Sequence, residues 1–163
     1  MLGRLVFRFR KCGLLTDGVV DVTVEEEEPE DPTRGYVPCY HFWVSRHGDP
    51  RKVGEVRLRV ASIEDQPSLL TSGQLGYEIN EDARGHGFAA RACLLVGPIA
   101  LSHGLDPLII TCDPRNVASV RTCEHLGATL VGTFDVPTDH PMYQKGRRRV
   151  CRYEWHPGSP SGR

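Results

Sequence analysis

The sequence NEDARGHGFAARA, residues 80–92, contains a short glycine loop between an expected strand and an expected helix. The strand is QLGYEIN (74–80), in which apolar and polar side chains alternate, and the helix begins at Phe88. The first N–H groups of a helix have no partner within it, and together with the helix dipole they attract a phosphate. The loop therefore predicts a site for a phosphorylated ligand, with Arg84 and His86 beside it.

The segment GHGFAA (85–90) also fits the G-x-G-x-x-[GA] pattern of dinucleotide-binding proteins. That fold places its first glycine directly after a buried parallel strand, and an acidic residue about 20 positions later at the end of the next strand. Here four residues (EDAR) separate the alternating strand from Gly85, and the candidate Asp106 precedes the next expected strand. The context therefore excludes a dinucleotide-binding fold.

Composition predicts one domain, which we assign to residues 1–156, followed by a flexible tail at 157–163. The chain has 163 residues, of which 39% are apolar, enough to bury one sizeable core. A formal net charge of -1 gives no general attraction to nucleic acid or a membrane surface. No apolar run approaches the roughly 18 residues that cross a bilayer, and residues 1–13 do not resemble a secretory signal. We therefore expect a cytoplasmic protein without nucleic-acid or membrane partners.

The six cysteines are scattered among apolar neighbours without a C-x-x-C pair, so we expect reduced, mostly buried thiols. Cys112, Cys123 and His125 come nearest to a zinc-binding set, but their spacing matches no common ligand pattern. We therefore predict no metal site.

Strands come first along the chain and helices come later. The apolar patterns predict strands at residues 19–25, 36–44, 52–60, 74–80, 107–112, 128–134 and 148–155. Helices are expected at 88–103, where Pro98 should kink the helix or interrupt a hydrogen bond, and at 117–126 after Asn116. The acidic segment 26–35 is expected to be a solvated loop because its prolines and like charges oppose a helix.

Around the glycine loop the chain resembles the GCN5-related N-acetyltransferases, the GNAT superfamily. Their loop pattern Q/R-x-x-G-x-G/A is matched by Arg84, Gly87 and Ala89. The strand before the loop, the helix after it and the segment CDPRNVASVRTCEHLGA (112–128) add to the resemblance, which covers about residues 73–156. That last segment is most similar to the branch that includes ribosomal-protein N-terminal acetyltransferases.

The resemblance implies an α/β (α+β) fold with a mixed, largely antiparallel, twisted sheet flanked by helices. It implies acetyl-CoA as co-substrate, no metal, and direct transfer of the acetyl group to a primary amine of a small molecule or peptide. A CoA-binding regulatory module without catalysis is the alternative, because two features of the family are missing. One is a tyrosine seven residues after Asn116, where this chain has Cys123, and the other is a set of helices after the first strand.

Carried onto this sequence, the resemblance implies that the strand end at 79–81 binds the pantetheine arm of acetyl-CoA and that the loop 84–89 binds its pyrophosphate. Asn116 and Ser119 would face the pantetheine region. The implied cofactor-binding residues are Ile79, Asn80, Glu81, Arg84, Gly85, His86, Gly87, Phe88, Ala89, Asn116 and Ser119. Asn116 is also a suitable helix N-cap, whether or not it binds a ligand. The alternative for Arg84 is a surface cation with no ligand.

Glu78 is the candidate general base, because it is the only acid on the strand that leads into the site. A solvated carboxylate is the alternative, since alternation puts Glu78 on the face opposite Tyr77. Backbone N–H groups at this strand end would stabilise the oxyanion. We interpret Cys123 as a small core residue rather than a proton donor.

The family's acceptor groove is shaped by helices after the first strand, where this chain has only EEEEPEDPTRG (25–35). Three arrangements are left open: a more open cleft, completion by a second subunit in a homodimer, or completion by the loop at 62–73. The acidic run Glu25–Glu28 would attract a cationic amine or simply keep the loop solvated, and Arg147–Arg149 are interpreted as a solvated turn.

Overall fold

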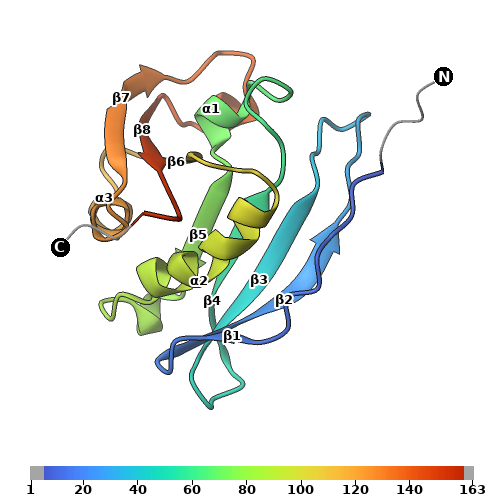
Figure 1. Ribbon diagram of the computed structural model, residues 1–163. Coiled ribbons are helices and arrows are strands. Elements are labelled where there is room, and N and C mark those ends of the chain that lie inside the picture. The colour runs from blue at the N-terminus through green and yellow to red at the C-terminus, as the bar shows by residue number, and fades with distance from the viewer. Residues whose placement is uncertain (1–5, 160–163) are drawn as a thin grey trace.

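The computed structural model describes residues 6–159, which form two antiparallel sheets with helices packed against them (Figure 1). The first sheet has the order β1-β2-β3-β4-β5, with strands Leu15–Thr16, Val20–Glu28, Cys39–Arg46, Lys52–Arg59 and Leu75–Ile79. The second has the order β6-β8-β7, with β6 at Leu108–Cys112, β7 at Thr129–Asp135 and β8 at Arg149–Trp155. The helices are α1 (Leu69–Ser72), α2 (Phe88–Ser102), α3 (Val117–His125) and α4 (Pro141–Gln144), with a 3₁₀ turn η1 at Glu81–Ala83.

The predicted α/β fold, with a largely antiparallel sheet flanked by helices, is confirmed. Helix α2 lies across one face of the first sheet (Figure 1), and its buried residues recur at helical spacing as Phe88, Ala92, Val96 and Ala100. The helix continues through Pro98, which is exposed, so the carbonyl left without a helical partner by the proline lies where water can reach. One cluster of buried apolar residues draws on both sheets.

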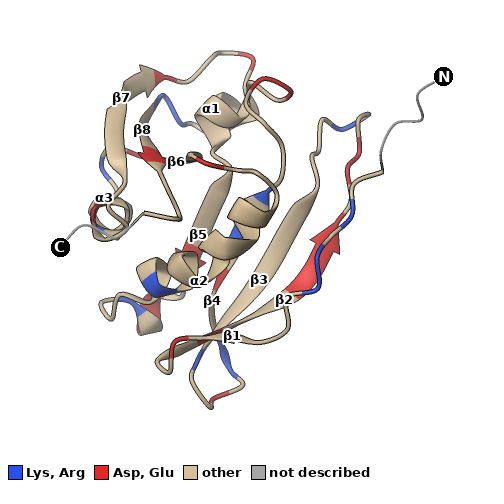
Figure 2. Ribbon diagram, in the orientation of Figure 1, with Lys and Arg blue, Asp and Glu red and all other residues tan. Residues whose placement is uncertain are grey.

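The two faces of the first sheet differ in chemistry. On β3, Tyr40, Phe42 and Val44 are fully buried in the core, while the alternating His41 and Trp43 lie on the other face and are half-buried. Charged side chains of β2 and β4 share this second face, which we call the polar face. Figure 2 shows the acidic residues gathered along the end of β2.

The prediction of a loop from residue 26 is wrong at its start, because β2 continues to Glu28. Glu26, Glu27 and Glu28 pair with His41, Tyr40 and Cys39 of β3. Pairing supplies backbone hydrogen bonds, and cations beside the acidic run offset its repulsion: Lys52 Nζ lies 2.9 Å from Glu25 Oε2. Between β2 and β3 the chain forms a turn closed by a bridge between Asp31 and Tyr36, not the helices of the acceptor groove.

Other expected features are found close to their predicted bounds, although the short elements β1, α1 and α4 were not predicted. All six cysteines are free thiols, as predicted. Of the predicted flexible tail, residues 160–163 lie outside the described part of the chain. Within residues 6–159, no helix is long and apolar enough to cross a membrane.

Candidate active site

A cleft opens where the two sheets diverge. They meet at Gln74, which is buried: its backbone N–H donates to the Ile109 carbonyl at 2.8 Å, and its side-chain oxygen accepts from the Ile109 N–H at 2.8 Å. Beyond this junction the end of β5 borders a cleft of about 640 Å³. Its walls come from β5, the η1–α2 loop and α3, so one cavity brings together the strand end, the glycine loop and the capped helix.

Most of the residues implied by the resemblance line this cleft, but not all. Those that do are Glu78, Ile79, Arg84, Gly85, Gly87, Phe88, Ala89, Asn116 and Ser119. Asn80 instead donates from its side chain to the Lys52 carbonyl at 3.2 Å, Glu81 begins the exposed turn η1, and His86 stacks on Phe88 with ring centroids 5.3 Å apart. Lining residues that the sequence analysis did not select are Tyr77, Ala83, Ala118, Arg121, Thr122, His125 and Arg147.

The glycine loop presents free backbone donors to the cleft. Gly85 and Gly87 have φ of +86° and +72°, and a Cβ added at either would meet no protein atom within 4 Å. Gly87 is the N-cap of α2 and no side chain caps it, so the N–H groups of the first turn are available to a ligand. This geometry suits an anion close to the backbone, as a pyrophosphate would be.

Basic side chains surround that loop. Arg84 Nε donates to the Ile79 carbonyl at 2.9 Å, which holds the guanidinium against the end of β5, and Arg84 lines the cleft. Arg121 of α3 and Arg147 come from parts of the sequence far from the loop and add positive charge to the same cavity. The cleft is therefore electrostatically matched to a polyphosphate.

Helix α3 begins at the cleft, and a side chain caps its N-terminus. Asn116 Oδ1 accepts from the Ser119 backbone N–H at 3.1 Å, so the predicted N-cap is confirmed. Because the cap uses only the amide oxygen, the amide nitrogen of Asn116 is left to face a ligand.

Tyr77 reaches from β5 to α3 across the inner end of the cleft. Its hydroxyl lies 2.8 Å from Ser119 Oγ, 3.3 Å from the Ser119 carbonyl oxygen and 3.6 Å from Cys123 Sγ. Burial raises the pKa of Tyr77 above the usual value of a phenol, so the hydroxyl is protonated at neutral pH and is a weaker acid than a solvated tyrosine. The sequence therefore lacks a tyrosine at position 123, but the fold delivers a tyrosine hydroxyl next to that position from the neighbouring strand.

Cys123 itself is fully buried, as predicted for a core residue. Hydrogen bonding to Cys112 and burial raise the pKa of Cys123. Hydrogen bonds from Cys123 and Ser119 lower the pKa of Cys112, and burial opposes this shift.

We expect Cys123→Ala to retain turnover to within about tenfold, because this thiol is shielded from the cleft by the Tyr77 hydroxyl. The lost buried sulfur should cost about 1 kcal/mol of stability. Steady-state acetylation and thermal unfolding measure the two effects. A thousandfold loss of turnover with cofactor binding intact would show that Cys123 is the proton donor.

Glu78 is exposed and lies on the polar face, directly opposite Glu55 of β4 in the strand register. It lines the cleft from the side opposite Tyr77. Glu55 is paired with cations, since Lys52 and Arg57 each lie 3.5 Å from its carboxylate. Glu78 has no such ion pair among the described residues, so its carboxylate is exposed beside the cleft without a cationic partner.

A glycine loop at an uncapped helix N-terminus, beside a sheet that splits, is typical of CoA-dependent acyltransferase folds. The family model described as an acetyltransferase (GNAT) domain matches residues 19–129. The chain therefore belongs to the GNAT acetyltransferase family, the acetyl-CoA-dependent N-acetyltransferases that its sequence resembles. The search of curated protein sequences gives no match.

Solved structures with this fold include ribosomal-protein acetyltransferases. The ribosomal-protein-S5-alanine acetyltransferase from Vibrio fischeri has a TM-score of 0.63 and 12% identity, with 90% of this chain and 99% of that chain covered. RimJ from Mycobacterium smegmatis, in complex with CoA-disulfide, has a TM-score of 0.53 and 17% identity over 72% of this chain and 53% of that chain. The microcin C7 self-immunity acetyltransferase MccE, in complex with acetyl-CoA and AMP, has a TM-score of 0.53 and 14% identity over 72% of this chain.

This chain spans only 61% of the length of MccE and 53% of that of RimJ. At identities this low, the similarity shows a shared fold but does not identify the acceptor of this chain.

Proposed function

We propose that this chain binds acetyl-CoA in the cleft and transfers the acetyl group directly to a primary amine of a small molecule or of a peptide N-terminus. The observation that carries the proposal is the uncapped N-terminus of α2 at a two-glycine loop, in one cavity with β5, the edge strand of the first sheet. The fold neighbours crystallised with acetyl-CoA or CoA-disulfide support the choice of cofactor.

The cofactor would lie along the cleft with its pyrophosphate on the loop. The N–H groups of the first turn of α2 and the guanidinium of Arg84 would hold the phosphates, with Arg121 and Arg147 nearby. The backbone of β5 at Ile79 would pair with the pantetheine arm, and the Asn116 amide would hydrogen-bond to it. Asn80, Glu81 and His86 would then act only through the shape of the loop.

The reaction needs an unprotonated amine, a donor to the oxyanion and a proton for the leaving thiolate. The amine nitrogen attacks the thioester carbon, and the C–N bond forms as the C–S bond breaks. Backbone N–H groups at the end of β5 stabilise the oxyanion, and Glu78 accepts a proton from the amine, directly or through water. The Tyr77 hydroxyl donates a proton to the CoA thiolate and recovers one from solvent.

The acceptor would approach over the polar face, where no helix intervenes between β2 and β3. Glu78 faces it there, and the acidic end of β2 adds a field that attracts a cationic amine. We also propose that a second subunit completes this open groove and that the protein is cytoplasmic, although the chemistry requires neither. The cytoplasmic location is proposed because the six thiols are free.

We expect acetyl-CoA to stabilise the folded chain, because a ligand that binds only the native state raises the free energy of unfolding. The gain is about 2.7 kcal/mol when the ligand is at a hundred times its Kd. Thermal unfolding with and without acetyl-CoA measures it, and a panel of amines with detection of free CoA thiol tests transfer. Absence of a thermal shift at millimolar acetyl-CoA would refute the proposal, whereas a shift without thiol release would favour the regulatory module.

A further inference from the structure

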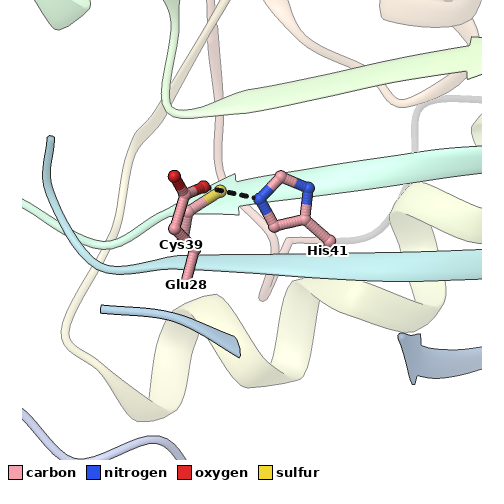
Figure 3. Close-up of side chains that lie close together, drawn as sticks. All are labelled: Glu28, Cys39 and His41. Atoms are coloured by element: carbon pink, nitrogen blue, oxygen red, sulfur yellow. Dashed lines mark hydrogen bonds and ion pairs between the residues drawn. The ribbon is translucent and has the colours of Figure 1, made fainter. Parts of the chain in front are cut away.

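Three side chains of types that bind metals converge on the polar face, at the Cys39 end of β3 (Figure 3). The ligand atoms of Glu28, Cys39 and His41 all lie within 4.8 Å of one another. Cys39 and His41 are two residues apart on β3 and therefore share a face, and Glu28 of β2 is the cross-strand partner of Cys39. We propose that these three residues bind a zinc ion that links β2 to β3.

The donor set selects the metal. A thiolate, an imidazole and a carboxylate are the three ligand types that Zn²⁺ takes in proteins, at about 2.0 to 2.3 Å, whereas Mg²⁺ and Ca²⁺ avoid sulfur. The sequence spacing predicts no metal site, and Cys112, Cys123 and His125 do not form such a cluster within residues 6–159.

Little rearrangement is needed to admit the ion. His41 Nε2 lies 2.8 Å from Glu28 Oε2, close enough to share a proton, and both atoms are on the same side as the Cys39 sulfur (Figure 3). A zinc ion would replace that proton. Cys39 is only 5% exposed, while the side chains of Glu28 and His41 are 34% and 23% exposed, so water can fill the fourth position from their side.

Some charged residues around the cluster oppose a bound cation and others favour it. Arg59 and Arg57 of β4 stand opposite Cys39 and His41 in the register and oppose a cation, while Glu26 on β2 favours one. A cysteine binds zinc as the thiolate, so metal binding releases a proton from the Cys39 thiol and affinity should increase with pH.

The ion would stabilise a place where this chain departs from its family. No groove helices follow β2, and the ladder between its acidic end and β3 stops at the Glu28–Cys39 pair, beyond which the Asp31–Tyr36 bridge closes the turn. A metal bond across the Glu28–Cys39 pair would brace the acidic end of β2 against β3. The proposal does not rest on acetyl transfer, since the cluster shares no residue with the cleft.

The test titrates chelator-treated, reduced full-length protein with Zn²⁺ alone, by calorimetry and by thermal unfolding. We expect one ion per chain and a rise in melting temperature, with Cys39→Ser and Glu28→Gln each losing more than tenfold in affinity. Cobalt(II) should give a thiolate-to-cobalt charge-transfer band that Cys39→Ser abolishes. Circular dichroism of each variant confirms that the sheet is intact.

A matched control is His47→Gln, because His47 Nδ1 lies 2.8 Å from Asp21 Oδ1 in another histidine–carboxylate pair at the end of β3. Zinc affinity should be unchanged in this variant. Arg59→Gln should tighten binding, because it removes the opposing charge. No binding, or binding that Cys39→Ser leaves unaltered, would overturn the assignment.

Discussion

Gly87→Val should abolish the thermal shift caused by acetyl-CoA. Gly87 has φ of +72° and lines the cleft, and a Cβ there would project into space that no protein atom occupies within 4 Å. A valine side chain would fill the space that the pyrophosphate needs next to the N-terminus of α2. Cofactor binding should therefore be lost rather than merely weakened. Thermal unfolding and direct titration with acetyl-CoA measure this.

The same substitution also strains the backbone, by about 1–3 kcal/mol for a branched residue at positive φ. Gly35→Val is the matched control, because Gly35 has φ of +70°, equally open surroundings and a position in the turn between β2 and β3. It should lose similar stability and keep the full acetyl-CoA shift. Normal cofactor binding by folded Gly87→Val would mean that the loop does not hold the phosphates.

Local signals account for what the sequence predicted well. Alternation defined β5, the glycines at 85 and 87 required a turn of positive φ, and Asn116 capped α3 with its own side chain. Each of these features depends on residues within a few positions of one another. The approximate position of the cleft could therefore be read from one short segment and its resemblance to a family.

Features made by tertiary contact were not predictable in this way. Tyr77 meets Ser119 across 42 positions of sequence, and Arg147 joins the cleft from the hairpin that was interpreted as a solvated turn. The acidic residues after Glu25 are expected to form a loop because prolines and like charges oppose a helix, yet pairing with β3 makes the first three of them the end of β2. Such pairing also creates the Glu28–Cys39–His41 cluster, which no spacing pattern reveals.

We expect Tyr77→Phe to lower kcat about a hundredfold while KM for acetyl-CoA and the thermal shift stay close to those of the unaltered protein. This hydroxyl lies 3.6 Å from Cys123 Sγ, beside the position of the family's tyrosine, and a phenol is protonated at neutral pH. The expected loss of kcat lies at the low end of the range for acid–base catalysis, because a thiolate is a good leaving group that needs little assistance from an acid. Steady-state kinetics with any accepted amine measure it.

A solvent deuterium isotope effect on kcat distinguishes proton donation by Tyr77 from a packing role, because only donation places a moving proton at this hydroxyl. The effect should be present in the unaltered enzyme and change in Tyr77→Phe. Tyr153→Phe is the matched control, since Tyr153 is also buried, with its pKa raised to about 12 by burial, but does not line the cleft. It should retain kcat. If both variants lost activity in proportion to lost stability, the role of Tyr77 would be to hold β5 against α3, and the proton would have to come from solvent.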